Sequence, residues 1–116
     1  MSHLNEIKHI EKPWGFEKIW AHTNNYVGKI IHVKKGHQLS LQYHKLKEET
    51  LLVNKGILHL VYGDNTLILN TGESIHIPPG TIHRMIAKED DVEVIEVSTN
   101  QLDDVVRLKD DYGRSH

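Results

Sequence analysis

Cysteine is absent from this sequence, which excludes disulfide bonds and thiolate metal ligands. Any metal ion that the chain binds must therefore be held by nitrogen and oxygen atoms. Aromatic residues make up only 6% of the 116 residues, which disfavours the large core of a helical bundle. The many Val, Ile and Leu residues instead favour β-strands.

An excess of one charge and a long apolar run are also lacking. The 14 Lys and Arg residues are scattered among 16 acidic residues, so there is no basic stripe suited to a nucleic-acid backbone. No apolar run approaches the roughly 20 residues that a bilayer crossing needs, and the N-terminus has no signal-peptide pattern. We therefore expect a cytoplasmic protein with no nucleic-acid or membrane partner.

The length of the chain predicts one domain that spans residues 1–116. Turn-forming stretches such as "NKG", "NTGE" and "PPGT" recur at short intervals. The segments between them have the length and the β-branched residues of strands: "YVGKIIHV", "LSLQY", "TLLV", "ILHLVY", "TLILN", "SIHI", "HRMIA" and "VEVIEVS". This pattern predicts an all-β sandwich or small barrel. The C-terminal stretch "QLDDVVRLKDDYG" fits either a short helix or an irregular tail.

One of the predicted strands has a wholly polar side. Ser40, Gln42 and His44 share this side because alternate residues of a strand point the same way. The opposite side is apolar and consists of Leu39, Leu41 and Tyr43. The polar side either faces solvent or lines a cavity.

Further ligand types follow at positions that can meet this strand. Glu49 begins the next strand after a short connection, so a tight reversal brings its carboxylate back beside His44. A rigid turn at Pro78, Pro79 and Gly80 then precedes His83. Each of these residues alone is more often an ordinary strand residue than a ligand. Together they predict a shared metal site formed by Gln42, His44, Glu49 and His83.

These turns and ligand types resemble the two motifs of the cupin superfamily. The first motif corresponds to Gly36, Gln42, His44, Glu49 and Gly56, with Gln42 in place of the first motif histidine. The second motif corresponds to Gly72, Pro78, Gly80, His83 and Ala87, with Ala87 in place of the final asparagine. The resemblance implies a cupin double-stranded β-helix, which is an antiparallel jelly-roll barrel.

A narrower resemblance concerns type II phosphomannose isomerases, whose domain is often fused behind a mannose-1-phosphate guanylyltransferase. The similar segments are "EKPWGFE", "GKIIHVKKG" with Lys29, "LSLQYH", "IPPGTIHR" and "DDVVRLKDDYGR". They cover about residues 10 to 114 of the chain. Lys47 and Thr50 depart from the family, which typically has an arginine and a histidine there.

This resemblance implies a metal-dependent aldose–ketose isomerase that converts mannose 6-phosphate to fructose 6-phosphate. It implies a divalent ion bound by Gln42, His44, Glu49 and His83; we expect zinc first, with Mn, Fe, Co and Ni as alternatives. As catalytic residues near the mouth of the barrel we expect Lys29, His76 and Arg84. Lys29 and Arg84 suit the phosphate or a negatively charged substrate oxygen, and His76 suits the general base.

Two other functions stay open at this point. Two histidines and one carboxylate also make the facial triad of non-haem iron oxygenases, and a non-catalytic sugar- or metal-binding module would use the same residues.

We also expect a homodimer in which the apolar side of the strand is covered by a second subunit. The cover would come from Trp14, Phe16 and Trp20, which otherwise cap their own barrel.

Overall fold

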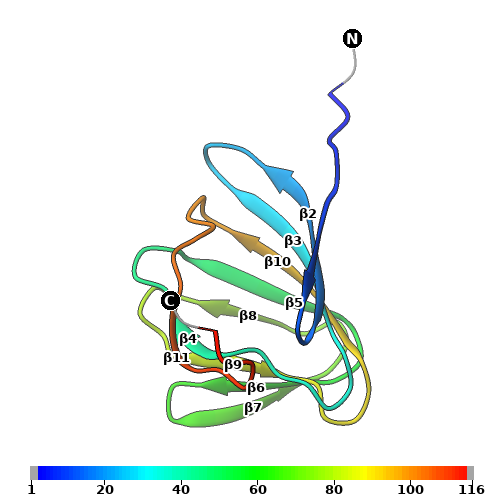
Figure 1. The fold of residues 1–116 in the computed structure, drawn as a ribbon, viewed down its shortest axis with the longest axis vertical. Coiled ribbons are helices and arrows are strands. Elements are labelled where there is room, and N and C mark those ends of the chain that lie inside the picture. The colour runs from blue at the N-terminus through cyan, green and yellow to red at the C-terminus, as the bar shows by residue number, and fades with distance from the viewer. Residues whose placement is uncertain (1–2, 115–116) are drawn as a thin grey trace.

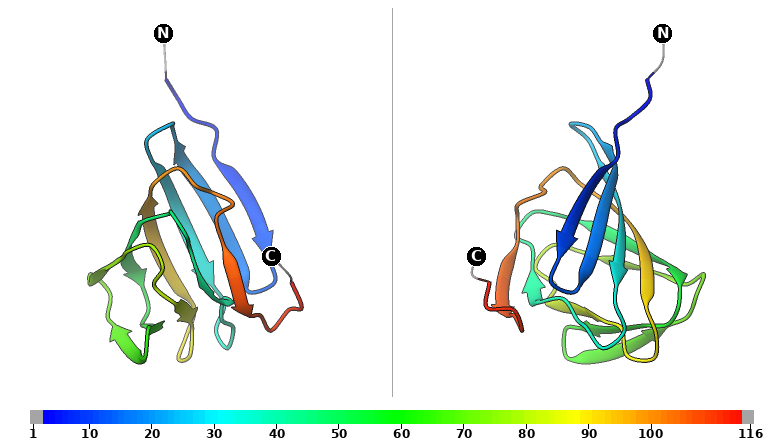
Figure 2. Two further views of the ribbon diagram at one scale, coloured as in Figure 1. Left: turned by 90° about the vertical axis from the view of Figure 1, so that its left-hand side faces the viewer. Right: turned by 45° about the vertical axis from the view of Figure 1, so that its right-hand side comes forward.

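Two antiparallel sheets make up the computed structural model, which describes residues 3–114 (Figure 1). The six-stranded sheet contains, in spatial order, β1 (Lys8–Lys12), β2 (Gly15–His22), β3 (Val27–Val33), β10 (Val92–Ser98), β5 (Glu49–Lys55) and β8 (Ser74–Ile77). The five-stranded sheet contains β11 (Val106–Lys109), β4 (Leu41–Tyr43), β9 (His83–Ile86), β6 (Leu58–Tyr62) and β7 (Asn65–Leu69). The chain crosses repeatedly from one sheet to the other, as Figure 2 shows, which is the topology of a double-stranded β-helix. The all-β jelly-roll prediction is confirmed.

The inner faces of the two sheets form an apolar core at one end of the barrel. Leu51, Leu58 and Leu60 are fully buried there, and each contributes roughly 2 kcal/mol through the burial of its side chain. The other end of the interior is polar, because the same strands place charged residues at their inward positions. The buried polar residues there include Glu17, Lys29, His44, Lys47, Glu49, His83, Glu96 and Ser98. The polar end of the barrel interior, called the polar chamber below, is a suitable place for a ligand site.

The C-terminal segment corrects the expectation of a short helix or an irregular tail. It forms strand β11, in which Val106 pairs with Tyr43 and Arg107 pairs with Gln42. The β-branched Val105 and Val106 favour an extended chain, and β11 covers what would otherwise be a free edge of β4. Among residues 3–114 there is no helix, and hence none with the length and apolarity needed to span a membrane.

Two apolar residues lie inside the barrel rather than outside it. Leu39 is 8% exposed and belongs to the core, because regular strand alternation begins only at Leu41. Trp14 is 2% exposed in the hairpin between β1 and β2, so it caps its own barrel and is not available to a second subunit. Phe16 stands on the outer face of β2 and stacks on His32. The homodimer stays a prediction.

Candidate metal centre

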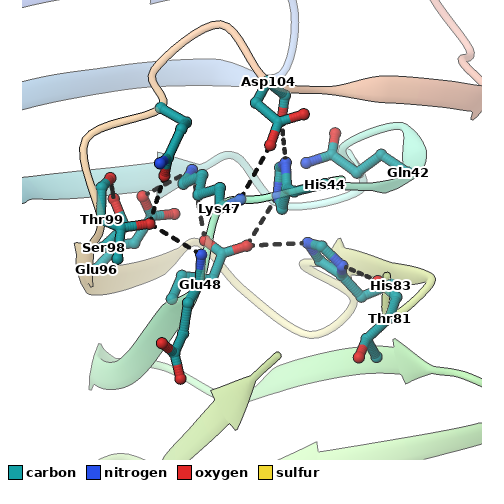
Figure 3. A network of polar contacts seen from close by, with 12 residues as sticks. Gln42, His44, Lys47, Glu48, Thr81, His83, Glu96, Ser98, Thr99 and Asp104 are labelled. Atoms are coloured by element: carbon teal, nitrogen blue, oxygen red, sulfur yellow. Dashed lines mark hydrogen bonds and ion pairs between the residues drawn. The ribbon is translucent and has the colours of Figure 1, made fainter. Parts of the chain in front are cut away.

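Three predicted ligands from different strands converge in the polar chamber. His44 follows β4, Glu49 begins β5 and His83 begins β9. Nε2 of His44 lies 2.9 Å, and Nε2 of His83 lies 3.2 Å, from Oε1 of Glu49. One donor atom from each residue lies within 4.8 Å of the other two, and all three side chains are buried. In Figure 3, dashed lines run from the imidazoles of both His44 and His83 to the same carboxylate oxygen.

Backbone carbonyl groups fix the orientation of both imidazoles. Nδ1 of His44 donates to the carbonyl oxygen of Asp104 at 2.5 Å, and Nδ1 of His83 donates to that of Thr81 at 2.8 Å. Because a carbonyl oxygen only accepts, each Nδ1 carries a proton and each Nε2 faces Glu49. Nε2 of His83 is buried and has no hydrogen-bond partner within residues 3–114.

This arrangement fits a metal ion. Two imidazole lone pairs and a carboxylate meet at one point, which is unfavourable unless a second proton or a cation lies between them. Metal-binding histidines usually donate their other ring N–H to a carbonyl or a carboxylate, as both histidines do here. His44, Glu49 and His83 therefore form a candidate site for a divalent ion.

Asp104 organises the loop between β4 and β5, and the sequence analysis did not identify it. Its carboxylate accepts hydrogen bonds from the backbone N–H groups of Lys45, Leu46 and Lys47 at 3.1, 2.7 and 2.9 Å. The bonds from Leu46 and Lys47 lower the pKa of Asp104 below its usual value. Since the carbonyl of Asp104 also accepts from His44, one residue positions both the loop and a ligand.

Buried charges surround the carboxylate of Glu49. Nζ of Lys47 lies 3.7 Å from Oε2 of Glu49 and 3.2 Å from Oε2 of Glu96. Burial and the charge of Glu49 raise the pKa of Glu96 to about 8. Burial would also raise the pKa of Glu49, but its hydrogen bond with Glu96 and its contacts with His44, His83 and Lys47 hold it well below its usual value. Glu49 is therefore ionised at neutral pH, whereas Glu96 holds a proton.

Gln42 lies beside the three converging residues. It stands directly opposite His83 on the neighbouring strand and lines the same interior cavity as His44. Its Oε1 accepts a hydrogen bond of 2.6 Å from the hydroxyl of Ser40, which is fully buried. The polar side of this strand thus faces the interior. The role of Gln42 as a fourth ligand stays a prediction.

The three predicted catalytic residues lie in different places. Lys29 lies in the polar chamber, is 8% exposed and has its Nζ 3.5 Å from Oε1 of Glu17. His76 points to the outer surface and its imidazole contacts the carboxylate of Glu48. Arg84 lies on the outer face of β9 and donates to the carbonyl of Lys109. The structure therefore brings only Lys29 to the site.

Two adjoining cavities connect His44 and Gln42 to the exterior. An outer cavity of about 380 Å³ lies between the β1–β2 hairpin and residues 102–107. An inner cavity of about 100 Å³ reaches Gln42, His44 and Lys47. Lys29, Glu17 and Arg107 line both cavities. The outer volume lies within the roughly 300–1,000 Å³ typical of small-molecule sites.

Solved structures with this arrangement of strands include cupins. An RmlC-like cupin from Shewanella frigidimarina superimposes with a TM-score of 0.77 at 14% identity, covering 89% of this chain and 95% of that one. KdgF from Halomonas sp. gives 0.75 at 21% identity, covering 89% and 93%. At such identities the likeness concerns the fold alone. The fold is that of an all-β cupin with a candidate metal site in its interior.

Sequence relatives define the family within this class. Residues 2–110 match the family Mannose-6-phosphate isomerase C-terminal, and the chain belongs to that family. The xanthan biosynthesis protein XanB from Xanthomonas campestris pv. campestris is 34% identical over 110 residues, which are 91% of this chain and 24% of XanB. The mannose-1-phosphate guanylyltransferase ManC from Salmonella typhimurium is 35% identical over 112 residues, which are 92% of this chain and 23% of ManC. The chain thus spans about a quarter of the length of these relatives.

Proposed function

We propose that this protein is a metal-dependent aldose–ketose isomerase that interconverts mannose 6-phosphate and fructose 6-phosphate. The observation that carries the proposal is the buried meeting of His44, Glu49 and His83, with both Nε2 atoms directed at one carboxylate oxygen. Membership of the Mannose-6-phosphate isomerase C-terminal family supports the choice of substrate.

The metal would be held by His44, Glu49 and His83, with the amide oxygen of Gln42 as a neutral fourth ligand. We expect zinc, because a set of nitrogen and oxygen donors without thiolate suits it, although Mn, Fe, Co and Ni accept similar sets. A bound divalent ion would supply Lewis-acid stabilisation of negative charge on the substrate oxygens. The charge of Glu49 and the fixed tautomers of the two histidines are this chain's own contribution to holding that ion.

Lys29 is the residue of the expected catalytic set that we retain. Its ammonium group lies next to Glu17 and lines the same inner cavity as His44, a position that suits the stabilisation of a developing oxyanion.

A non-catalytic binding module is the second candidate, and Lys47 favours it. Its ammonium group is paired with Glu49, so that it competes with a metal ion for the same carboxylate. Lys47 also stands where the type II family typically has an arginine, and Thr50 stands where it has a histidine.

Turnover by the metal-loaded protein tests the proposal. The protein is loaded in turn with Zn, Mn, Fe, Co and Ni, and ¹³C-labelled mannose 6-phosphate is followed by NMR. We expect fructose 6-phosphate with at least one metal and none after chelation. Tight binding without turnover would replace the isomerase by the binding module, and oxygen consumption with iron alone would replace it by the oxygenase.

A further inference from the structure

The guanidinium group of Arg107 lies on the inner face of the five-stranded sheet. Arg107 on β11 is directly opposite Gln42 on β4, and Gln42 is directly opposite His83 on β9. Residues that face each other across neighbouring strands point to the same side of a sheet. Arg107, Gln42 and the candidate ligand His83 therefore form one row across the sheet, with Gln42 in the middle.

The guanidinium of Arg107 is short of partners. Its Nε atom is buried and has no hydrogen-bond partner, and no carboxylate within residues 3–114 approaches it to ion-pair distance. The other cationic side chains that line the inner cavity each have one: Lys12 and Lys29 have Glu17, Lys47 has Glu49, and Arg114 has Asp110. A buried donor without an acceptor is unfavourable, which suits a site completed by an anion.

The cavity around Arg107 carries an excess of positive charge. Five cationic side chains line its inner part: Lys12, Lys29, Lys47, Arg107 and Arg114. One carboxylate, that of Glu17, lines the same part. Cations also outnumber acids in the outer cavity, where Lys8, Lys12, Lys29 and Arg107 stand against the carboxylates of Glu17 and Asp103. Walls with an excess of one charge concentrate ligands of the opposite charge, so this cavity favours an anionic ligand.

We propose that Arg107 binds the phosphate group of the sugar phosphate, with Lys12 as a second cation at the cavity entrance. This inference rests on the proposed function, since it takes the phosphosugar as the ligand. The planar fork of a guanidinium group matches two phosphate oxygens, and a lysine adds a point charge. The phosphate then lies on the outer side of Gln42, and the carbon atoms at the other end of the sugar point toward His44 and His83.

The inference gives Arg107 the role that the sequence analysis expected for Arg84. Arg84 follows His83 directly, so strand alternation turns it to the outer face, where it binds the backbone of β11. Arg107 is far along the chain from both motifs, yet the pairing of β11 with β4 brings it to the chamber.

Calorimetric titration of the metal-loaded protein tests this assignment. The ligands are mannose 6-phosphate and mannose, and the variants are Arg107→Gln and Lys12→Gln. The matched control is Lys109→Gln, an exposed cation on the same strand that lines neither cavity. We expect Arg107→Gln to weaken binding of mannose 6-phosphate about 10- to 100-fold, as the loss of a charged hydrogen-bond donor does. Arg107→Gln should bind mannose and metal as the wild type does. The Lys109→Gln control should bind mannose 6-phosphate with wild-type affinity.

The outcomes separate this inference from the isomerase proposal. If Arg107→Gln and Lys12→Gln bind mannose 6-phosphate as the wild type does, or if Arg84→Gln alone weakens it, the assignment is wrong while turnover still supports the isomerase. If the wild type binds without turnover and Arg107→Gln loses that binding, the phosphate site stands and the isomerase does not. Failure of the wild type to bind mannose 6-phosphate overturns both. Should Arg107→Gln not fold, Arg107→Lys keeps the charge without the fork. An affinity for mannose 6-phosphate below that of the wild type then supports the assignment, and wild-type affinity opposes it.

Discussion

The backbone N–H of Gly80 donates a 2.7 Å hydrogen bond to the carbonyl oxygen of His44. This bond joins the two motif turns, because Gly80 belongs to the turn that leads to His83. Gly80 has a φ of 82°, in the left-handed region that glycine adopts at little cost. A glycine is therefore favoured at position 80, because it lets the turn before His83 approach the backbone of His44.

Gly80→Ala should weaken both folding and metal binding. No atom lies within 4 Å of the added Cβ, so the cost is backbone strain alone, about 1 kcal/mol, or a fall of roughly 4 °C in Tm. Gly72→Ala is a matched control, because Gly72 has a φ of 91°, equally open surroundings and an N–H that bonds the carbonyl of Val53 rather than a ligand. Calorimetry should show similar losses of Tm for both variants but a weaker metal affinity only for Gly80→Ala. Equal metal affinities in the two variants would show that this turn does not set the site.

Asp104 is expected to act on the metal site through the loop that it holds. Asp104→Asn keeps the size of the side chain but replaces one acceptor oxygen by a donor, so it cannot accept all three N–H groups of Lys45, Leu46 and Lys47. We predict a metal affinity about 10- to 100-fold lower, as for other residues that orient ligands. Asp103→Asn is the control, and titration with a fluorescent zinc indicator is the measurement. Wild-type affinity in Asp104→Asn would mean that the loop is held by other contacts.

Much of this architecture can be predicted from the sequence because strand alternation and turn chemistry are local. The strands, the inward direction of Gln42 and His44, and the participation of Glu49 and His83 all follow from such local signals. Arg84 could also have been placed on the outer face, since it is the neighbour of an inward histidine. His76 similarly precedes Ile77, which takes the inner position.

The contributions of Asp104 and Arg107 could not be predicted in this way. Asp104 is 60 residues from His44, and it meets that residue only because the C-terminal segment returns as β11. A sequence pattern that fits a helix, a tail or a strand does not reveal this pairing. The buried contact between Lys47 and Glu96 is likewise set by the closure of the barrel and not by their neighbours in sequence.

The protonated state of Glu96 predicts a pH dependence of stability in the metal-free protein. A glutamate in the unfolded chain has a pKa of about 4.3, whereas in the folded protein the pKa of Glu96 is raised to about 8. The folded state thus binds one more proton between these values, and its unfolding free energy falls as the pH rises from 5 to 8. The slope from this group is at most about 1.4 kcal/mol per pH unit.

Urea unfolding in the presence of chelator measures this slope. Glu96→Gln cannot ionise and should flatten the curve over this range, whereas Glu93→Gln, on the outer face of the same strand, should keep the wild-type slope. An unchanged slope in Glu96→Gln would mean that Glu96 is ionised in the folded protein.

As a neutral oxygen ligand, Gln42 is expected to keep the bound ion a strong Lewis acid. A histidine at this position offers a stronger nitrogen donor and completes a set of three histidines and one glutamate, whereas an amide oxygen leaves the ion more electron-poor. Gln42→His should therefore keep or raise the metal affinity and lower proton exchange on the sugar phosphate. Gln42→Ala should bind metal more weakly than the wild type. If Gln42→His exchanges protons at the wild-type rate, or Gln42→Ala binds metal as well as the wild type does, the glutamine is only a polar residue bonded to Ser40.

Proton exchange in deuterium oxide tests the central claim most directly, because it detects the isomerase chemistry even when net conversion is slow. Metal-loaded protein is incubated with mannose 6-phosphate or fructose 6-phosphate, and NMR follows deuterium at C1 and C2. We predict incorporation with the wild type, and none with His83→Ala or His44→Ala, which should lose the metal and the exchange together. Absence of deuterium at both carbons with fully metal-loaded wild-type protein, or undiminished incorporation by His83→Ala, would contradict the account.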